Sequence, residues 1–222
     1  MSHSVSNGRR PAFPPPTRPA SDARVLVLFV HPAPQNSRVN RPLMEAARAV
    51  PGVTVHDLYE RYPDHHVDVA TEQSLLAAHE TIVFQHPFYW YSSPSLLKAW
   101  QDLVLELGWA YGPGGTALAG KRLLSAITTG GRDTAYTATG SNRFTVRQFL
   151  APFEQTAHLC RMTYLPPLVF HGTFAAKPSE VADHAVFYAR VLAALVSGRS
   201  PPQESLANER LDHELGWLEV TP

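Results

Sequence analysis

The stretch QHPFYWYSSPSLLKAWQD, residues 85–102, decides the fold that we expect for this chain. It follows an apolar run, Ile82 to Phe84, that is typical of a buried strand. The residues from Pro87 to Tyr91 then form a loop that is too aromatic to be left in water without a flat partner. Ser93 is expected to cap a helix whose first position is Pro94, where the missing backbone N–H costs nothing. This order of strand, aromatic loop and helix predicts that the loop contacts a planar ligand.

The composition limits the size and class of the protein. Its 222 residues, 44% of them hydrophobic, suffice for one full core, so one domain is expected. Nineteen basic residues balance 19 acidic ones, which favours a small ligand over nucleic acid or anionic lipid. The single cysteine, Cys160, excludes an intrachain disulfide and a CxxC redox or zinc centre. No apolar run approaches the roughly 20 residues that span a bilayer and no secretory signal is present, so we expect a soluble, cytoplasmic protein.

The two ends of the chain differ from its centre. Residues 1–22 are rich in proline and small polar residues, and we expect a disordered leader there because such a composition cannot close a core. One domain is expected over residues 23–197, followed by a charged tail over residues 198–222. The apolar side chains of the tail, which could dock onto the body or onto another subunit, are Leu211, Leu215, Trp217 and Leu218.

Between these ends, apolar runs alternate with helical segments. The expected strands span residues 25–30, 53–58, 81–84, 123–128 and 163–170. The expected helices end near residues 50 and 79 or span residues 94–107, 144–159 and 179–195, with a break at Pro152. Near-continuous apolar strands separated by helices predict an α/β fold with a parallel sheet covered on both faces. Five such strands favour the doubly wound, flavodoxin-like order.

The segment after the first strand is a candidate binding loop, because ligands of open parallel sheets lie beyond the carboxyl ends of the strands. HPAPQNSRVN, residues 31–40, leads there into a helix. Ser37, Asn40 and the free N–H groups of the helix start could receive a phosphate, while Arg38 adds charge and His31 a further donor. The alternative is that Ser37 or Asn40 only caps the helix and that His31 bonds to the loop. Taken alone, this segment favours the cap.

The segment after the fourth strand is the second candidate loop. Thr128, Thr129, Gly130 and Gly131 offer backbone N–H groups there with little obstruction by side chains. Tyr136 could point its phenol toward the same crevice. The alternatives are a tight turn at the glycines and ordinary core packing of the tyrosine.

Together with the aromatic loop, these segments would surround one crevice with a phosphate seat, an aromatic wall and a rim of amide donors. Flavin mononucleotide (FMN) needs all three, because its ring stacks on aromatic groups, its pyrimidine edge takes hydrogen bonds and its phosphate goes to a helix N-terminus. The combination is more specific than its parts, and it predicts an FMN site.

Other motifs carry less weight. Gly112, Gly114 and Ala117 imitate a dinucleotide glycine pattern, but a strand follows them where a helix should, so we assign them to a loop. The polar run from Asp64 to Asp68 contains adjacent histidines without a second cluster of ligands, and we predict no metal. The sequence has no GxxxxGK[ST], GxSxG or HExxH motif, which removes support for phosphoryl transfer and hydrolysis.

Several sequence motifs, which occur in the same order along the chain, resemble those of the flavin-dependent NAD(P)H:quinone oxidoreductase family. This family includes mammalian DT-diaphorase and the bacterial ancillary subunits of glutathione-regulated potassium efflux systems, and the chain is most similar to the ancillary group. The resemblance runs from about Val25 to Leu195. The motifs that carry the resemblance are HPxxxxSxxN at 31–40, VHDLY at 55–59, QHPFYWYSSPSLLKAW at 85–100, WAYGPGGTALAGK at 109–121, TTGG at 128–131 and LPP at 165–167.

The resemblance implies roles for individual residues in and near these motifs. Those that would hold FMN are His31, Ser37, Arg38, Val39 and Asn40 at the phosphate and ribityl chain, Pro87, Phe88, Tyr89 and Trp90 at the ring, and Thr128, Thr129, Gly130 and Gly131 at its N1 and O2 side. Tyr136 matches a tyrosine that assists hydride transfer, but its usual histidine partner is here Asn142, so the relay of the mammalian enzymes cannot operate in the same way. Tyr111 matches a pocket tyrosine that the second subunit of a dimer supplies, which implies a homodimer.

The function that the resemblance implies is reduction of a quinone by NAD(P)H, with the hydride passing through the N5 atom of FMN. FAD is an alternative cofactor. A second hypothesis is a regulatory subunit that binds a potassium antiporter at the inner membrane, and it is compatible with the first. A third is an electron carrier like flavodoxin, which would stabilise a one-electron semiquinone.

Overall fold

The computed structural model describes residues 24–213 and 215–218, so the leader expected at residues 1–22 lies outside the described residues. Its strands are β1 (Val25–Phe29), β2 (Val53–Asp57), β3 (Thr81–Pro87), β4 (Arg122–Thr128), β5 (Thr163–Tyr164) and β6 (Leu168–Phe170). All of them pair in parallel, in the order β2-β1-β3-β4-β5, and β6 also pairs with β4. The predicted flavodoxin-like order is confirmed.

The fifth predicted strand is broken. It was expected to run through residues 163–170, whereas β5 and β6 are separated by residues 165–167. Pro166 and Pro167 lie in this gap, and neither has an N–H that could bond to β4. In contrast, β3 is longer than expected and continues to Pro87, which pairs with Thr128 of β4.

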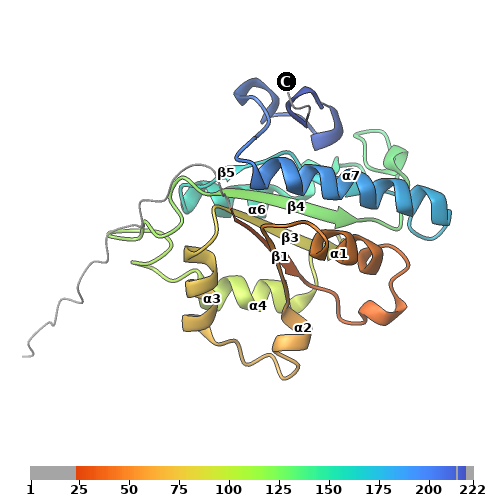
Figure 1. Ribbon diagram of the computed structural model, residues 1–222. Coiled ribbons are helices and arrows are strands. Elements are labelled where there is room, and N and C mark those ends of the chain that lie inside the picture. The colour runs from red at the N-terminus through yellow and green to blue at the C-terminus, as the bar shows by residue number, and fades with distance from the viewer. Residues whose placement is uncertain (1–23, 214, 219–222) are drawn as a thin grey trace, which may run out of the picture.

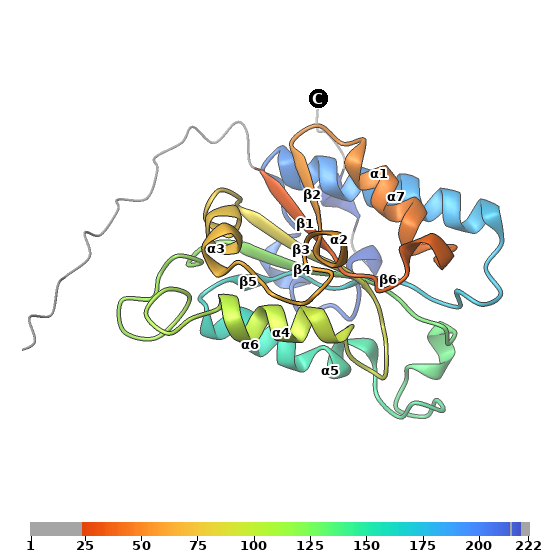
Figure 2. The ribbon, with the colours of Figure 1, turned by 90° about the horizontal axis from the view of Figure 1, so that it is seen from below.

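Helices cover both faces of the sheet (Figures 1 and 2). The helices are α1 (Asn40–Arg48), α2 (Leu58–Arg61), α3 (Val69–Ala77), α4 (Ser95–Val104), α5 (Val146–Phe149), α6 (Ala151–Leu159) and α7 (Pro178–Val196). Val25 and Val27 of β1 belong to the apolar cluster under α1 and α7. Leu26 and Leu28 belong to the opposite cluster, under α3, α4 and α6. This alternation follows from the two-residue period of a strand and gives the domain two cores.

Of three sequence-based predictions about helix boundaries, two differ from the structure and one is confirmed. The predicted cap by Ser93 is wrong: Pro94 itself occupies the N-cap position of α4 and no side chain caps this helix. The predicted break near Pro152 is confirmed, because α5 and α6 meet at Leu150 and the proline lies in the first turn of α6. The helix expected to end near residue 79 is divided into α2 and α3 by a loop over residues 62–68.

The tail docks onto its own chain. It forms three short 3-10 turns, Gln203–Ser205, Leu211–His213 and Gly216–Leu218, which lie beyond α7 in Figure 1. Leu211 and Leu218 are buried in the core under α7. Arg199 Nη1 donates to the carbonyl of Leu218 at 2.9 Å, and Arg122 Nη1 donates to the carbonyl of Arg199 at 2.8 Å. Among the described helices, none is both long and apolar enough to cross a bilayer.

Candidate functional site

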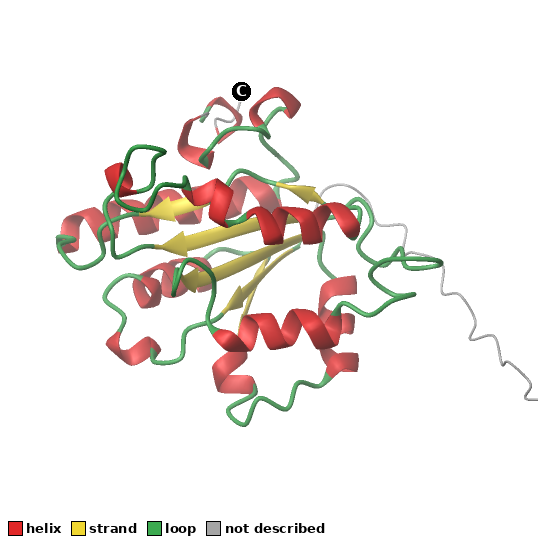
Figure 3. Cartoon of the chain, turned by 180° about the vertical axis from the view of Figure 1, so that it is seen from behind, coloured by secondary structure: helices red, strands yellow, loops and turns green. Residues whose placement is uncertain are grey.

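A crevice of about 750 Å³ opens at the carboxyl edge of the sheet, toward which the strand arrows of Figure 3 point. The loops after β1, β3 and β4 line it, as the sequence predicts. The predicted residues on its wall are His31, Ser37, Arg38, Val39, Asn40, Pro87, Phe88, Tyr89, Trp90, Thr128, Gly130, Gly131 and Tyr136. Thr129 is fully buried behind this wall. The structure thus brings the predicted residues together, and that they bind a ligand stays a prediction.

The start of α1 forms one end of the crevice. The N-cap position of α1 is Val39, but Ser37 Oγ accepts a hydrogen bond from the N–H of Asn40, the first residue of the helix, at 2.9 Å. Ser37 thus supports the helix start and also lines the crevice. Asn40 is held by two further bonds, from its Nδ2 to Thr128 Oγ1 at 2.8 Å and from Gln85 Nε2 to its carbonyl at 3.0 Å. Its Oδ1 atom is buried and has no hydrogen-bond partner among the described residues. A buried acceptor on a pocket wall is a place for a ligand donor.

Two basic residues stand beside this helix start. His31 Nδ1 accepts from the N–H of Ala33 at 3.1 Å, so the expected bond to the loop is present. Burial lowers the pKa of His31, and the neutral ring then carries its proton on Nε2, which makes that atom a donor. Arg38 Nη2 donates to the carbonyl of Ala176 at 3.3 Å, which ties the guanidinium to the segment before α7.

The aromatic loop after β3 has a buried and an exposed part. Phe88 is buried, and its N–H donates to the carbonyl of Thr128 at 2.8 Å. Trp90 is 92% exposed, although it belongs to the crevice wall. Trp90 and Tyr91 have φ values of 47° and 61°, in the left-handed region that side chains other than glycine rarely adopt. Strained residues of this kind concentrate at ligand sites, and here they hold a large apolar ring at the mouth of the crevice.

The glycines after β4 keep the opposite rim open. A Cβ atom on Gly130 would lie 2.3 Å from Cε2 of Phe174, and one on Gly131 would lie 3.2 Å from Cε2 of Tyr136. Larger residues at these positions would therefore displace two rings that line the crevice. The two glycines therefore allow the rings of Phe174 and Tyr136 to pack close to the backbone at this rim, in addition to any role in a turn.

Tyr136 lies between the crevice and the chain segment after β6. Burial raises the pKa of its phenol, and hydrogen bonds with Thr129 and Asn142 partly oppose this rise. Its ring packs 6.1 Å from that of Phe88 and 5.5 Å from that of His171, measured between centroids. The phenol thus stays protonated at neutral pH and borders the crevice.

Sequence reasoning missed three residues at this site. His171 follows directly on β6, and its place after an apolar strand is a signal that could have found it. Phe174 lines the crevice a few residues further on. Gln85 is fully buried in β3 and joins α1 to α7, since its Oε1 accepts from the hydroxyl of Tyr188 at 3.3 Å. A glutamine inside an apolar strand is a signal that could have found it.

Tyr111 does not line the crevice of its own chain. It belongs to the loop between α4 and β4. In Figure 1 this loop lies at the end of the sheet where β4 begins, opposite to the carboxyl ends of the strands. The same loop contains Gly112, Gly114 and Ala117, which confirms that the glycine pattern belongs to a loop. In the polar run before α3, His66 pairs with Asp64 at 3.1 Å and Asp68 caps α3 through the N–H of Thr71.

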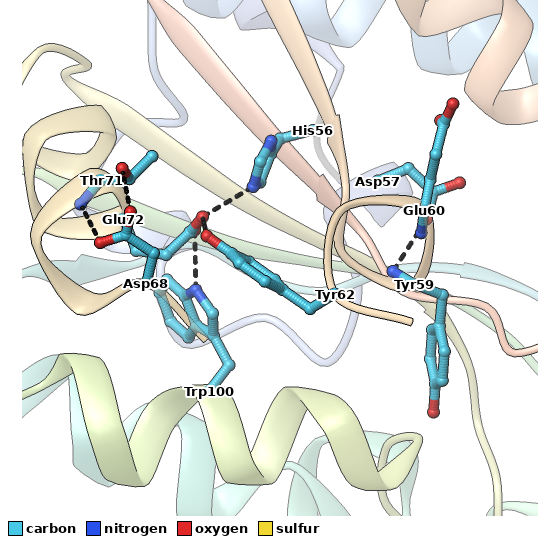
Figure 4. A network of polar contacts seen from close by, with 9 residues as sticks. All are labelled: His56, Asp57, Tyr59, Glu60, Tyr62, Asp68, Thr71, Glu72 and Trp100. Carbon is cyan, nitrogen blue, oxygen red and sulfur yellow. Dashed lines mark hydrogen bonds and ion pairs between the residues drawn. The ribbon is translucent and has the colours of Figure 1, made fainter. Parts of the chain in front are cut away.

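A second polar cluster lies under α3, away from the crevice (Figure 4). Glu72 is fully buried and accepts hydrogen bonds from His56 Nε2 at 2.8 Å, the Tyr62 hydroxyl at 2.6 Å and Trp100 Nε1 at 2.8 Å. Burial alone would raise the pKa of this carboxyl, but the three donors outweigh it and the pKa is lowered. These donors occupy both carboxylate oxygens, so the cluster joins β2, α3 and α4 and has no opening for a ligand.

These features define the class of protein: the chain belongs to the family with the flavodoxin-like fold, whose sequence profile matches residues 23–192. Among characterised relatives, the glutathione-regulated potassium-efflux system ancillary protein KefG of Enterobacter sp. (strain 638) is 47% identical over 171 residues, which are 77% of this chain and 93% of that protein. The structure of general stress protein 14 from Treponema denticola in complex with FMN is similar with a TM-score of 0.74, at 40% identity, and the match covers 78% of this chain and 99% of that one. An NADPH-quinone reductase from P. pentosaceus matches with a TM-score of 0.70 and 32% identity, over 76% of this chain and 97% of that one.

Proposed function

We propose that this protein is an FMN-dependent NAD(P)H:quinone oxidoreductase. The observation that carries the proposal is one crevice, of about 750 Å³, that joins a helix start, an aromatic wall and a glycine rim at three successive strand ends. A volume of this size is usual for a site that takes a cofactor. The FMN complex of the Treponema protein and the reductase from P. pentosaceus support the same assignment.

The residues present fit the proposed cofactor. The N–H groups at the start of α1, with Ser37 and Arg38, are suited to the phosphate. The buried Oδ1 of Asn40 lacks a protein partner among the described residues and is suited to a ribityl hydroxyl. The loop from Pro87 to Trp90 and the rim from Thr128 to Gly131 are suited to the two sides of the ring. FMN is the cofactor that we propose, and FAD is the alternative.

Bound FMN would supply the exchange of a hydride between NAD(P)H and a quinone, which would enter the crevice in turn. The chain's own task is to hold and orient these molecules. Gly130 and Gly131 line the crevice, and their backbone N–H groups would stabilise negative charge that develops on a molecule bound against this rim. Tyr136 holds a proton beside the crevice, because burial raises the pKa of its phenol, and it is the residue that we propose as proton donor to the reduced quinone.

The visible spectrum of the purified protein tests the assignment. We expect a yellow protein with one FMN per chain, which is bleached by NAD(P)H without air and regains its colour when a quinone is added. A colourless protein that takes up neither FMN nor FAD would contradict the proposal. A stable one-electron semiquinone on titration would favour an electron carrier like flavodoxin.

We also propose that the protein acts as a homodimer in which Tyr111 reaches the crevice of the second subunit. In its own chain this tyrosine lies at the opposite end of the sheet from the crevice, so only another copy could bring it there. Light scattering should give twice the mass of one chain. The substitution Tyr111→Phe should raise the KM for the quinone while the dissociation constant of FMN stays constant.

A second function is supported by the relative from Enterobacter, which is named as an ancillary protein of a potassium efflux system and matches over 93% of its length. We propose that this chain binds an antiporter of that kind at the cytoplasmic side of the inner membrane. Co-purification with the antiporter and slower potassium efflux after deletion of the gene would support this role. Unchanged efflux after deletion would contradict it and would leave the reductase proposal intact.

A further inference from the structure

The helix α5 (Val146–Phe149) is a single turn that follows the crevice residue Asn142 after a few positions. So short a helix does not hold its own position, because its few hydrogen bonds do not outweigh the cost of forming the first turn. Thr145 and Gln148 close a capping box at its start, which stabilises the turn itself. The contacts that place this turn in the fold must come from other parts of the chain.

Arg147 joins α5 to the tail. Its Nη1 atom donates to the carbonyl of Leu206 at 2.7 Å and also to that of Asn208, while its Nη2 atom donates to Glu154 of α6 at 2.7 Å. The side chain of Arg147 is 13% exposed. Because hydrogen bonds from a charged donor are stronger than those between neutral groups, this guanidinium is a firm link between α5 and the tail.

The tail is itself fixed near this link. The N–H of Leu211 donates to the carbonyl of Pro167 at 3.0 Å, in the gap between β5 and β6, and the side chain of Leu211 is buried. A cavity of about 380 Å³ lies between the start of α5, at Val146, and the tail, at Arg210. The bonds of Arg147 thus connect two segments that have a cavity between them. The tail also lies beyond the family profile, which ends at residue 192.

The last residue of α5, Phe149, packs against the aromatic wall of the crevice. Its ring stacks on that of Tyr91, with 5.0 Å between the centroids and 22° between the planes. It also meets the rings of Phe88 and Tyr136 edge-on, with centroid distances of 5.9 and 6.4 Å. All three of these rings line the crevice, so α5 supports its wall.

Tyr91 depends on this support more than the other rings do. Its φ of 61° and the φ of 47° at Trp90 lie in the left-handed region. Backbone strain of this kind persists only where the surrounding contacts enforce it. The hydroxyl of Tyr91 also donates to Asn142 Oδ1 at 3.4 Å, in the loop that leads into α5. The ring and the hydroxyl of Tyr91 therefore both rely on the position of α5.

We propose that Arg147 is a positioning residue through which the docked tail holds the aromatic wall of the crevice in the shape that a flat ring needs. The contacts run from the tail carbonyls through Arg147 and α5 to Phe149, and from there to Tyr91. None of the described tail residues lines the crevice, so the tail acts on it through α5. The proposal rests on the proposed flavin site, since a preformed wall raises affinity only for a ligand that binds against it.

Hydrogen–deuterium exchange of the full-length protein without added cofactor tests the link itself. The N–H of Ser92 donates to the carbonyl of Tyr89 at 3.0 Å, and the N–H of Tyr89 donates to that of Pro87 at 3.1 Å, so both amides report opening of the aromatic loop. In Arg147→Gln they should exchange about tenfold faster than in the wild type, because hydrogen bonds from a charged group are lost. Arg147→Lys, which keeps the charge and a donor, should restore part of the protection.

Arg199→Gln is the matched control. It also removes a hydrogen bond from an arginine to a tail carbonyl, that of Leu218, but at the end of the tail that contacts Arg122. The control should lower the melting temperature and leave exchange in the aromatic loop as it was. Equal acceleration of this exchange in both variants would show a general loosening of the fold and would overturn the proposal. Exchange at the wild-type rate in Arg147→Gln would overturn it as well.

Ligand affinity connects the link to the site. In Arg147→Gln the dissociation constants of FMN and of riboflavin should rise by the same factor, about fivefold, because the wall is less well preformed and the phosphate seat at α1 is untouched. Phe149→Leu interrupts the same contacts without touching the tail. The double variant should bind no more weakly than the weaker single variant, since two changes in one chain of contacts do not add.

The outcomes separate this proposal from the proposed function. Losses of affinity that multiply in the double variant would overturn the connection through Phe149 and leave the reductase function standing. Failure of the wild type to bind FMN would overturn the proposed function, and the exchange measurement would still decide whether Arg147 holds the aromatic loop.

Discussion

The crevice and the Glu72 cluster are two polar regions of one domain. They differ in how many of their buried polar atoms have a hydrogen-bond partner within the protein. Three donors from β2, α4 and the loop after α2 meet the buried carboxylate of Glu72. At the crevice, Asn40 keeps a buried oxygen without a partner among the described residues, and Trp90 stands 92% exposed. A closed polar cluster holds elements together, whereas an incomplete one beside an opening indicates a ligand.

The largest effect should come from Glu72→Ala, which leaves three buried donors without an acceptor. We expect the free energy of unfolding to fall by about 3–5 kcal/mol, as when one partner of a buried charged pair is removed. Urea denaturation measures this loss, and the FMN affinity of the folded protein should stay unchanged. Glu45→Ala, which removes an exposed pair with Arg48 on α1, is the control and should cost less than about 1 kcal/mol. A Glu72→Ala protein that is as stable as the wild type but binds FMN more weakly would contradict this, because the cluster would then serve ligand binding and not stability.

Acid should act at different pH values on the Glu72 cluster and on His86, a buried residue that belongs to neither region. His86 is buried in β3, and burial lowers its pKa from 6.5 to about 4. Because the folded state disfavours the charged ring, its contribution is complete above pH 6.5 and is lost as the pH falls toward 4, by an amount on the order of 3 kcal/mol. Glu72, whose folded pKa is depressed, contributes fully above its unfolded pKa and loses this contribution at lower pH, as its folded pKa is passed.

Urea denaturation at a series of pH values checks these two windows. His86→Phe should make the loss in the upper window smaller, and the remainder should come from His184, whose pKa burial also lowers to about 4. Glu72→Gln should reduce the loss in the lower window. A stability of the wild type that does not change between pH 6.5 and 4 would contradict the first assignment.

A smaller effect is expected from Gly131→Val, which acts on the open region alone. The new side chain would push against the ring of Tyr136, since even its Cβ atom would lie 3.2 Å from Cε2. We expect FMN affinity to fall at least about tenfold, or roughly 1.4 kcal/mol, as measured by quenching of flavin fluorescence. The matched control is Gly120→Ala, where φ is +77° and no atom lies within 4 Å of the added Cβ. The control should lower stability by about 1 kcal/mol through backbone strain and leave FMN affinity as it was.

The smallest effect should follow Ser37→Ala at the start of α1. The N–H of Asn40 loses its acceptor, and we expect a loss of about 1 kcal/mol in unfolding free energy. If the hydroxyl also contacts a phosphate, the affinity for FMN should fall while the affinity for riboflavin, which has no phosphate, stays the same. An equal loss for both ligands would show that Ser37 acts only as a cap.

The sheet order and the crevice could be predicted because they follow from local patterns. Apolar runs of strand length mark β1 to β4, and in a parallel sheet the loops after them must meet at one edge. The break between β5 and β6 was not predicted, although the two prolines between them are a signal that could have indicated it, since neither can donate to a neighbouring strand.

The Glu72 cluster could not be predicted from the sequence. Glu72 looks like an ordinary surface residue of α3, and its partners lie 10, 16 and 28 positions away. Only the packing of α3 and α4 on the sheet makes them neighbours. The same holds for His171, which is 42 positions from Thr129, and for the tail, whose docking depends on an apolar surface that α7 helps to create.

The left-handed pair Trp90 and Tyr91 has a consequence for the heat resistance of the molecule. A side chain in this backbone region costs about 1–2 kcal/mol, which a glycine would recover. A Trp90→Gly variant should therefore melt at a higher temperature than the wild type, while it offers a smaller flat surface at the mouth of the crevice. Trp90 thus lowers the melting temperature of the protein while it supplies a large ring to the wall of the crevice.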